Sequence, residues 1–289
     1  MEIELVADYE CDIGENPLWH PQEQSVYWTD IDRGKIFCFD TKTNTHKQVY
    51  QGAAVSGFTV QEDGKLLLFM AKGAVATWEK GNLEYIIKEI PEDRETRFND
   101  VIADPRGRVF CGMCGTPGIK NGLGKLYRID TDGSITTVLE NIIGPNGIGF
   151  NLDATKMYYT DSGKGTIYEF DYDIETGSIS NQRIFIKVPH EKGVPDGMTV
   201  DSKGYIWSAR WDGSAVYQYD PKGIEIQKIT FPAKKVSSVT FGGPNYMDMY
   251  VTTALQGSSK ELDGADAGAL FRCSAGIQGK PEFYSKLSI

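Results

Sequence analysis

Six polar side chains that carry an oxygen atom occupy equivalent places along the chain. Each lies ten or eleven residues before a strand-like run, and they are Glu15, Ser56, Asn99, Asn146, Asp196 and Ser238. Carboxylate and amide oxygens are hard ligands that suit Ca²⁺, Mg²⁺ or Mn²⁺ when they meet in a confined space. Two carboxylates brought close together would repel each other, and a cation would relieve that repulsion. The set contains no His or Cys, which argues against a dedicated zinc site.

A simpler interpretation of three of these residues is a tight turn. Ser56, Asn146 and Asp196 are each followed by glycine, and proline precedes the last two. Pro-Asn-Gly and Pro-Asp-Gly favour turns, because Pro fixes φ and Gly accepts a positive φ. A turn does not require Glu15, which is a poor turn former. Six equivalent positions converge on one axis only in a propeller, so the metal interpretation depends on the fold.

A repeated β-unit would position these side chains. Short β-rich runs are separated by Gly, Asp and Asn turns, which is typical of an all-β chain. Six segments share a plan of a short strand, a loop, and a second strand that ends in an acidic turn. The first strands of these segments begin at residues 26, 67, 109, 157, 206 and 249, so they are 41, 42, 48, 49 and 43 residues apart. A period of about 40 to 50 residues with several strands per repeat predicts propeller blades.

The repeats predict one all-β domain over residues 1–289, a six-bladed β-propeller with a central metal-binding channel. The six polar residues would lie near the start of the innermost strand of each blade, at one mouth of the channel. Residues 1–10 read as a strand that pairs into the last blade and removes an exposed edge. A solenoid also fits the period, but it would need capping repeats at its ends, and none is evident.

Charge and composition exclude several classes of function. Lys and Arg number 30 against 40 Asp and Glu, and the net charge of −10 argues against nucleic-acid binding. We expect no membrane partner, because no apolar run approaches the roughly 20 residues of a membrane span. Five scattered cysteines and the lack of a visible signal peptide predict reduced thiols and a cytoplasmic location. The pair Cys111 and Cys114 is alone, so we interpret both as buried structural thiols.

Serine-hydrolase chemistry finds no support in the sequence. The motif G-x-S-x-G is absent, and the histidines are limited to His20, His46 and His190, none of which belongs to the six polar positions.

Taken in order, the motifs resemble the senescence-marker-protein/gluconolactonase family, the regucalcin-like lactonases. The resemblance covers nearly the whole chain, with about one motif per blade. Its carriers are Gly14-Glu15-Asn16-Pro17-Leu18-Trp19, Arg97-Phe98-Asn99-Asp100, Asn146-Gly147, Pro195-Asp196-Gly197-Met198, Phe241-Gly242-Gly243 and Val251-Thr252-Thr253-Ala254. The resemblance implies a six-bladed propeller with one divalent cation in its channel.

By the same resemblance, Glu15, Asn146 and Asp196 are the expected metal ligands. Arg97 and Asn99 would face the substrate. Asp196 would also be placed to act in catalysis, either as the base or by positioning the attacking water. The expected reaction is hydrolysis of a small lactone, an aldonolactone as in the gluconolactonases. Ca²⁺ is the expected ion, with Mg²⁺, Mn²⁺, Fe²⁺ or Zn²⁺ as alternatives.

One departure from the family pattern leaves undetermined which sugar the substrate is, and whether it is a sugar. Family sugar lactonases often carry a carboxylate in the loop after the third landmark strand, whereas residues 111–118 contain no acid. Two other functions also stay open: a metal-dependent phosphotriesterase-like hydrolase, and a non-catalytic propeller whose cation is structural. For Arg97, the alternative is a solvated surface arginine beside Glu95.

Overall fold

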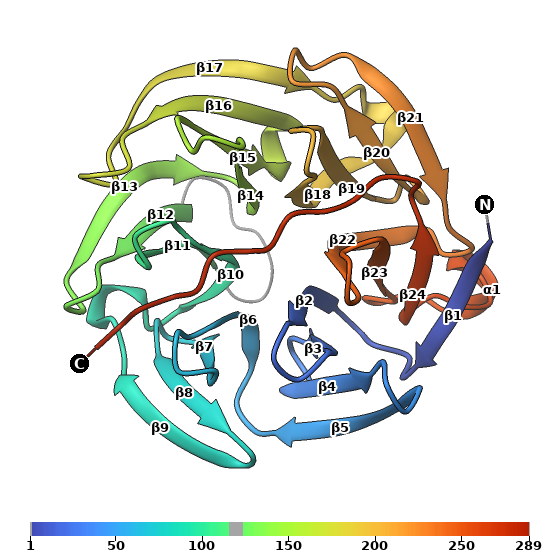
Figure 1. The fold of residues 1–289 in the computed structure, drawn as a ribbon, viewed down its shortest axis with the longest axis horizontal. Helices are drawn as coiled ribbons and strands as arrows, with labels where there is room; N and C mark the ends of the chain where they lie inside the picture. The colour runs from blue at the N-terminus through green and yellow to red at the C-terminus, as the bar shows by residue number, and fades with distance from the viewer. Residues whose placement is uncertain (1, 116–123, 289) are drawn as a thin grey trace. The chain divides into compact units, whose positions relative to one another are not determined.

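The described chain is built almost entirely from β-strands. The computed structural model describes residues 2–115 and 124–288 and arranges their strands in six four-stranded sheets (Figure 1). All strand pairs within the sheets for which a register is defined are antiparallel, as in the pair of β2 with β3. The strands that begin the six sequence repeats are the second strands of the sheets for five repeats, and β23 of the last sheet for the sixth. The fold is a six-bladed β-propeller, which confirms the prediction from the repeats.

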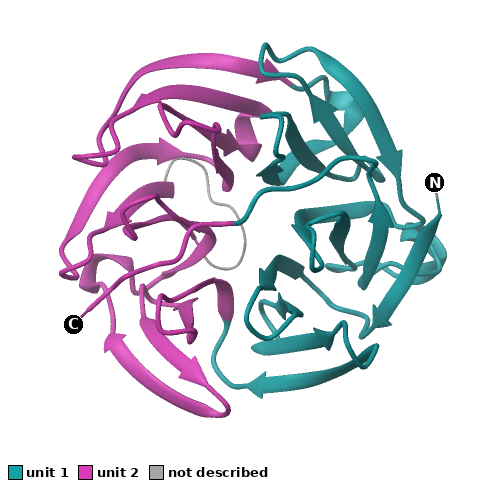
Figure 2. Cartoon of the chain, viewed as in Figure 1, with its two compact units in different colours: residues 1–54, 188–281 teal, residues 55–187, 282–289 magenta. Residues whose placement is uncertain are grey.

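The sheets fall into two compact units of three sheets each (Figure 2). Unit 1 comprises residues 1–54 and 188–281, and unit 2 comprises residues 55–187 and 282–289. The strands of unit 2 are β6 (Val55–Val60), β7 (Leu66–Met70), β8 (Val75–Glu79), β9 (Asn82–Ile87), β10 (Thr96–Ala103), β11 (Val109–Gly115), β12 (Gly124–Ile129), β13 (Ile135–Ile142), β14 (Pro145–Phe150), β15 (Lys156–Asp161), β16 (Thr166–Tyr172) and β17 (Ile179–Lys187).

Unit 1 contains a sheet that combines the first strand of the chain with the last three strands. Its strands are β1 (Ile3–Asp8), β2 (Gly14–His20), β3 (Ser25–Asp30), β4 (Lys35–Asp40), β5 (Thr45–Gln51), β18 (Val194–Val200), β19 (Ile206–Trp211), β20 (Ala215–Tyr219), β21 (Glu225–Thr230), β22 (Lys235–Gly242), β23 (Asp248–Ala254) and β24 (Ala269–Ser274). Strand β1 pairs with β24, so the sheet has the order β1-β24-β23-β22. The N-terminal strand therefore completes the last sheet, as the sequence predicts.

Burial decreases from the first strand of a sheet to the fourth. Every residue of β6, β14 and β22 is buried, whereas β5, β9 and β21 are largely exposed. Within unit 1, β2 and β18 both contact β22, and within unit 2, β6 and β14 both contact β10. The first strands are thus the inner strands of each unit, in agreement with the prediction.

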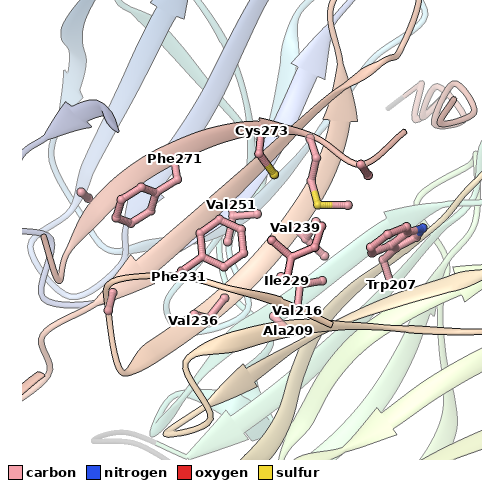
Figure 3. Packing of buried hydrophobic residues seen from close by; sticks show 14 of the residues in the cluster. Trp207, Ala209, Val216, Ile229, Phe231, Val236, Val239, Val251, Phe271 and Cys273 are labelled. Carbon is pink, nitrogen blue, oxygen red and sulfur yellow. The ribbon is translucent and has the colours of Figure 1, made fainter. Parts of the chain in front are cut away.

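Apolar side chains from neighbouring sheets fill the space between them. In unit 1, Trp207, Val236, Val251 and Phe271 belong to one buried cluster (Figure 3). Burying an aliphatic or aromatic side chain of this size contributes about 1.5–3 kcal/mol. Trp207 also donates its indole N–H to Asp201 Oδ2 at 2.9 Å. Such packing fixes the inner strands, and with them any side chain that those strands carry.

Helical elements are few and short. In the part of the chain that the structure describes, they are one α-helical turn, α1 (Lys260–Asp263), and 3₁₀ turns at Pro91–Asp93, Ser162–Lys164 and His190–Lys192. Over residues 2–115 and 124–288, no helix is long and apolar enough to span a membrane.

Candidate active site

Each inner strand carries a β-bulge at the place where the sequence predicts a polar residue. The register shifts fall between Glu15 and Leu18, Val55 and Gly57, Phe98 and Val101, Asn146 and Ile148, Pro195 and Met198, and Val236 and Ser238. All six polar residues therefore lie within a bulge or at its border. A bulge inserts an extra residue, bends the strand and redirects side chains, and bulges are frequent next to active sites.

The turn interpretation of these positions is wrong. Ser56, Asn146 and Asp196 lie inside strands β6, β14 and β18 rather than in the loops between strands. Gly197 follows Asp196 without a positive φ, so it does not serve a left-handed turn. Its lack of a side chain has another use, because an added Cβ would lie 2.1 Å from Ser238 Oγ. Glycine allows β18 to approach β22 closely at this bulge.

Unit 1 carries the two predicted carboxylate ligands on strands that flank β22. Glu15 is 4% exposed and Asp196 is 5% exposed. Glu15 Oε2 accepts the backbone N–H of Asn16 at 3.0 Å. The chain next to each carboxylate touches the bulge of β22, since Ser237 Oγ donates to the Gly14 carbonyl at 2.5 Å and Gly197 abuts Ser238. The residues next to both carboxylates thus contact the same inner strand.

Unit 2 joins its predicted site residues through side-chain hydrogen bonds. Arg97 Nη1 donates to Asn99 Oδ1 at 2.7 Å, and Asn99 Nδ2 donates to Asn146 Oδ1 at 2.7 Å. Asn99 Nδ2 also donates to the Pro145 carbonyl at 2.7 Å, and Asn146 Nδ2 donates to Ser162 Oγ at 2.8 Å. These four side chains form a continuous chain of bonds, which we call the amide relay: Arg97, Asn99, Asn146 and Ser162.

Arg97 is an interior residue. It is 6% exposed, so the alternative of a solvated surface arginine is wrong. Its bond to Asn99 shows that the two side chains lie on the same side of the strand. Arg97 Nη1 also donates to the Phe98 carbonyl at 2.9 Å. The guanidinium is therefore held close to the bulge of β10, where its fixed fork of donors can orient a polar partner.

The bulge of β10 also contains a carboxyl group, that of Asp100. Burial raises the pKa of Asp100 to about 7, and the positive charge of Arg97 opposes this rise. Burial raises the pKa of Tyr159 well above its ordinary value, with smaller contributions from the charges of Asp161, Asp100 and Cys114. Asp100 directly follows Asn99 in the sequence, but the spacing of residues does not indicate whether its carboxyl group is buried or exposed to solvent.

Metal binding by carboxylates, cysteines and histidines alone has no support in the described part of the chain. No group of three or more His, Cys, Asp and Glu side chains there could hold a metal ion. The predicted ligand set contains two carboxylates and one amide, so it needs the Asn146 oxygen as a third donor. Asn146 Oδ1 accepts one bond from Asn99, and a carbonyl oxygen has two lone pairs. The donors present are hard oxygens and fit an alkaline-earth or similar divalent ion.

The cysteines behave as structural thiols. All five are buried and unlinked. Cys111 packs with Val109 and Met113 in an apolar cluster, and burial raises its pKa well above the ordinary value. A protonated thiol is a poor metal ligand and nucleophile. The interpretation of the Cys111 and Cys114 pair as structural is consistent with this burial.

Comparison with known proteins places this geometry in context. Residues 13–255 match the family model described as SMP-30/Gluconolactonase/LRE-like region. The chain is 43% identical to pentonolactonase XacC of Haloferax volcanii, over 100% of both chains. It is 32% identical to regucalcin of Homo sapiens, over 96% of each chain. The solved structure of a luciferin-regenerating enzyme matches with a TM-score of 0.91 and 29% identity, over 99% of each chain.

The raised pKa of Asp100 predicts a specific pH dependence of stability. The ordinary pKa is 3.8, so the folded protein holds a proton that the unfolded chain has released between about pH 4 and pH 7. The free energy of unfolding should therefore decrease as the pH rises through this window. In Asp100→Asn this decrease should shrink by about 1–3 kcal/mol between pH 5 and pH 8, measured by urea unfolding with chelator present.

Asp132→Asn is the matched control for this prediction. Backbone and side-chain bonds from Ser134 lower the pKa of this exposed turn residue, so it is ionised in both states across the window. Its stability profile between pH 5 and pH 8 should parallel that of the wild type. If Asp100→Asn also ran parallel to the wild type, Asp100 would not hold a proton in the folded protein.

Proposed function

The chain belongs to the SMP-30/gluconolactonase/LRE-like family, and from this premise we propose that it is a metal-dependent lactonase that opens a small aldonolactone. The observation that carries the proposal is the 43% identity to a pentonolactonase over the full length of both chains. Pentonolactones are therefore the first substrate class to test, ahead of gluconolactone. The oxygen donors at the six bulges support the proposal: Glu15, Ser56, Asn146, Asp196 and Ser238 are buried, and Asn99 is partly buried.

We propose Glu15, Asn146 and Asp196 as the ligands of one divalent cation, with Ca²⁺ as the first candidate. Glu15 and Asp196 belong to unit 1 and Asn146 belongs to unit 2. Support comes from their equivalent places at the bulges of β2, β14 and β18. Two carboxylates would neutralise the charge of the ion, and the amide oxygen would add a neutral donor. Availability of the metal also decides which ion such an oxygen site holds.

In the proposed reaction, the cation and the side chains have different roles. A bound divalent ion polarises an ester carbonyl and stabilises negative charge on its oxygen. Asp196 would orient the attacking water and accept its proton as the water oxygen bonds to the carbonyl carbon. That proton would then pass to the ring oxygen as the ring C–O bond breaks, which gives the open hydroxy acid. Arg97 donates to the lactone oxygens and hydroxyls, while Asn99 Oδ1 keeps a second lone pair for a hydroxyl, because Arg97 uses only one. Close positioning of water and lactone lowers the entropic part of the barrier.

We further propose a cytoplasmic location and a small-molecule lactone as the partner, with no nucleic-acid or membrane partner. Five buried, unlinked cysteines support a reducing compartment. The net charge of −10 gives no reason to expect a nucleic-acid partner.

A pH-stat screen of aldonolactones with and without chelator tests the proposed activity. We expect acid release from a pentonolactone, loss of that release with excess chelator, and recovery when Ca²⁺ or Mn²⁺ is added back. A paraoxon-type phosphotriester as the preferred substrate would support the phosphotriesterase alternative. Absence of hydrolysis of every lactone, together with a chelator-induced fall in melting temperature, would show a structural cation and overturn the proposal.

Asp196→Asn separates catalysis from metal binding. The variant keeps an oxygen donor but loses one negative charge, so cation affinity should decrease and remain measurable at millimolar metal. At saturating metal, the rate should stay at least about 10²-fold below wild type, because a general base has been removed. Glu15→Gln is the matched control, since it also loses one ligand charge but no base, and saturating metal should restore most of its rate. Equal recovery of both variants would show that Asp196 only holds the ion.

A further inference from the structure

The hydrogen bonds of the amide relay run in one direction only. Arg97 is a donor without acceptor capacity, so the atom of Asn99 that faces it must be the oxygen. The Pro145 carbonyl is an acceptor only, so the atom of Asn99 that faces it must be the nitrogen. These two fixed groups determine the orientation of the Asn99 amide independently of each other. Amide orientations are assigned from such networks, and here both ends agree.

The orientation of Asn99 determines that of Asn146. Because Asn99 Nδ2 is a donor, the atom of Asn146 at 2.7 Å from it must be the oxygen. The Asn146 nitrogen then points the other way and donates to Ser162 Oγ at 2.8 Å. A flipped Asn146 would place two N–H₂ groups against each other. Its nitrogen would also replace the oxygen as the group offered to a cation, and an N–H₂ group cannot ligate a metal.

The turn in which Ser162 lies holds this residue next to Asn146. The Ser162 backbone N–H donates to the Gly144 carbonyl at 2.8 Å, and Asp161 Oδ1 accepts the Gly144 N–H at 3.1 Å. Gly163 lies so close to Ile143 that an added Cβ would be 2.1 Å from Ile143 Cγ2. The turn at Ser162–Lys164 is therefore fixed to the segment that leads into β14, and the buried Ser162 hydroxyl has little freedom to move away.

We propose that Ser162 is a positioning residue for the metal-binding amide of Asn146. This role of Ser162 rests on the proposed function, and neither sequence spacing nor a motif indicates it. By accepting the Asn146 N–H₂ group, Ser162 Oγ holds the side chain in the rotamer that presents Oδ1 as a ligand. Removing the acceptor leaves a buried N–H₂ group without its partner, which favours rotation of the amide out of place.

Calcium titration of four proteins tests the role of Ser162. Isothermal titration of the chelator-stripped protein should show on the order of 10-fold weaker Ca²⁺ binding for Ser162→Ala, as for other outer partners of metal ligands. Ser162→Thr keeps the hydroxyl and should bind Ca²⁺ nearly as tightly as the wild type. Ser162→Cys replaces a strong acceptor by a weak one of similar size and should bind several-fold more weakly, which preserves the test if the alanine variant does not fold.

Thr160→Val is the matched control. Thr160 lies opposite Asn146 in the pairing of β14 with β15, yet its buried Oγ1 has no hydrogen-bond partner in the described part of the chain. The valine variant should bind Ca²⁺ within about 2-fold of the wild type, because it removes a hydroxyl from a residue paired with Asn146 without breaking a hydrogen bond. A decrease equal to that of Ser162→Ala would show a general perturbation and overturn the inference.

The remaining outcomes separate this inference from the proposed function. If the wild type binds Ca²⁺ and both Ser162→Ala and Ser162→Cys bind it equally well, only the positioning role is overturned. If the wild type binds neither Ca²⁺ nor Mn²⁺, the metal-dependent function and the positioning role are overturned together.

Discussion

The β-bulge in the inner strand of each sheet is the feature on which the candidate site depends. A regular strand would pair every residue and alternate its side chains between the two faces of the sheet. The bulge adds an unpaired residue and breaks that alternation, so a side chain can leave the packed faces. Six sheets repeat it at the same place. The polar residues therefore occupy positions that the apolar packing between sheets does not require.

Burial of the carboxylates at the bulges has an energetic cost. Glu15 and Asp196 are almost fully buried, and burying a carboxylate costs free energy unless its charge is compensated. The proposed cation would compensate two such charges at once. The amide relay adds a neutral donor whose orientation is determined by Arg97 and the Pro145 carbonyl. Apolar packing between the sheets fixes the positions of the strands. The bulges let the polar side chains point away from the packed faces, and hydrogen bonds determine which of their atoms face the candidate site.

The sequence predicts the architecture because its information repeats. Landmark strands such as Val26–Asp30 and Met157–Asp161 recur at similar spacing, and each corresponds to the second strand of a sheet. The pairing of β1 into the last sheet follows from the need to cover an edge. Burial of Cys111 and Cys114 follows from their place in a β-rich run. These features depend on pattern and periodicity, which a single sequence contains.

The finer features of the site depend on contacts between distant residues. Pro-Asn-Gly and Pro-Asp-Gly suggest turns, yet Asn146 and Asp196 lie in bulged strands, since tertiary pairing overrides the local preference. Ser162 is one serine among many until the fold brings its hydroxyl to Asn146. The raised pKa of Asp100 arises from burial, which the sequence next to Asn99 does not reveal. Local patterns identify which residues carry chemistry, whereas the fold decides how they are oriented.

The central claim is that Glu15, Asn146 and Asp196 hold one divalent cation. The most direct measurement is a crystal structure of the protein soaked in Mn²⁺, with anomalous scattering used to locate the metal. We predict one strong anomalous peak per chain, with side-chain oxygens of all three residues within roughly 2.0–2.6 Å, the range of hard divalent ions bound by oxygen. A well-ordered crystal that shows no peak at these side chains, or only a peak elsewhere, would contradict the claim.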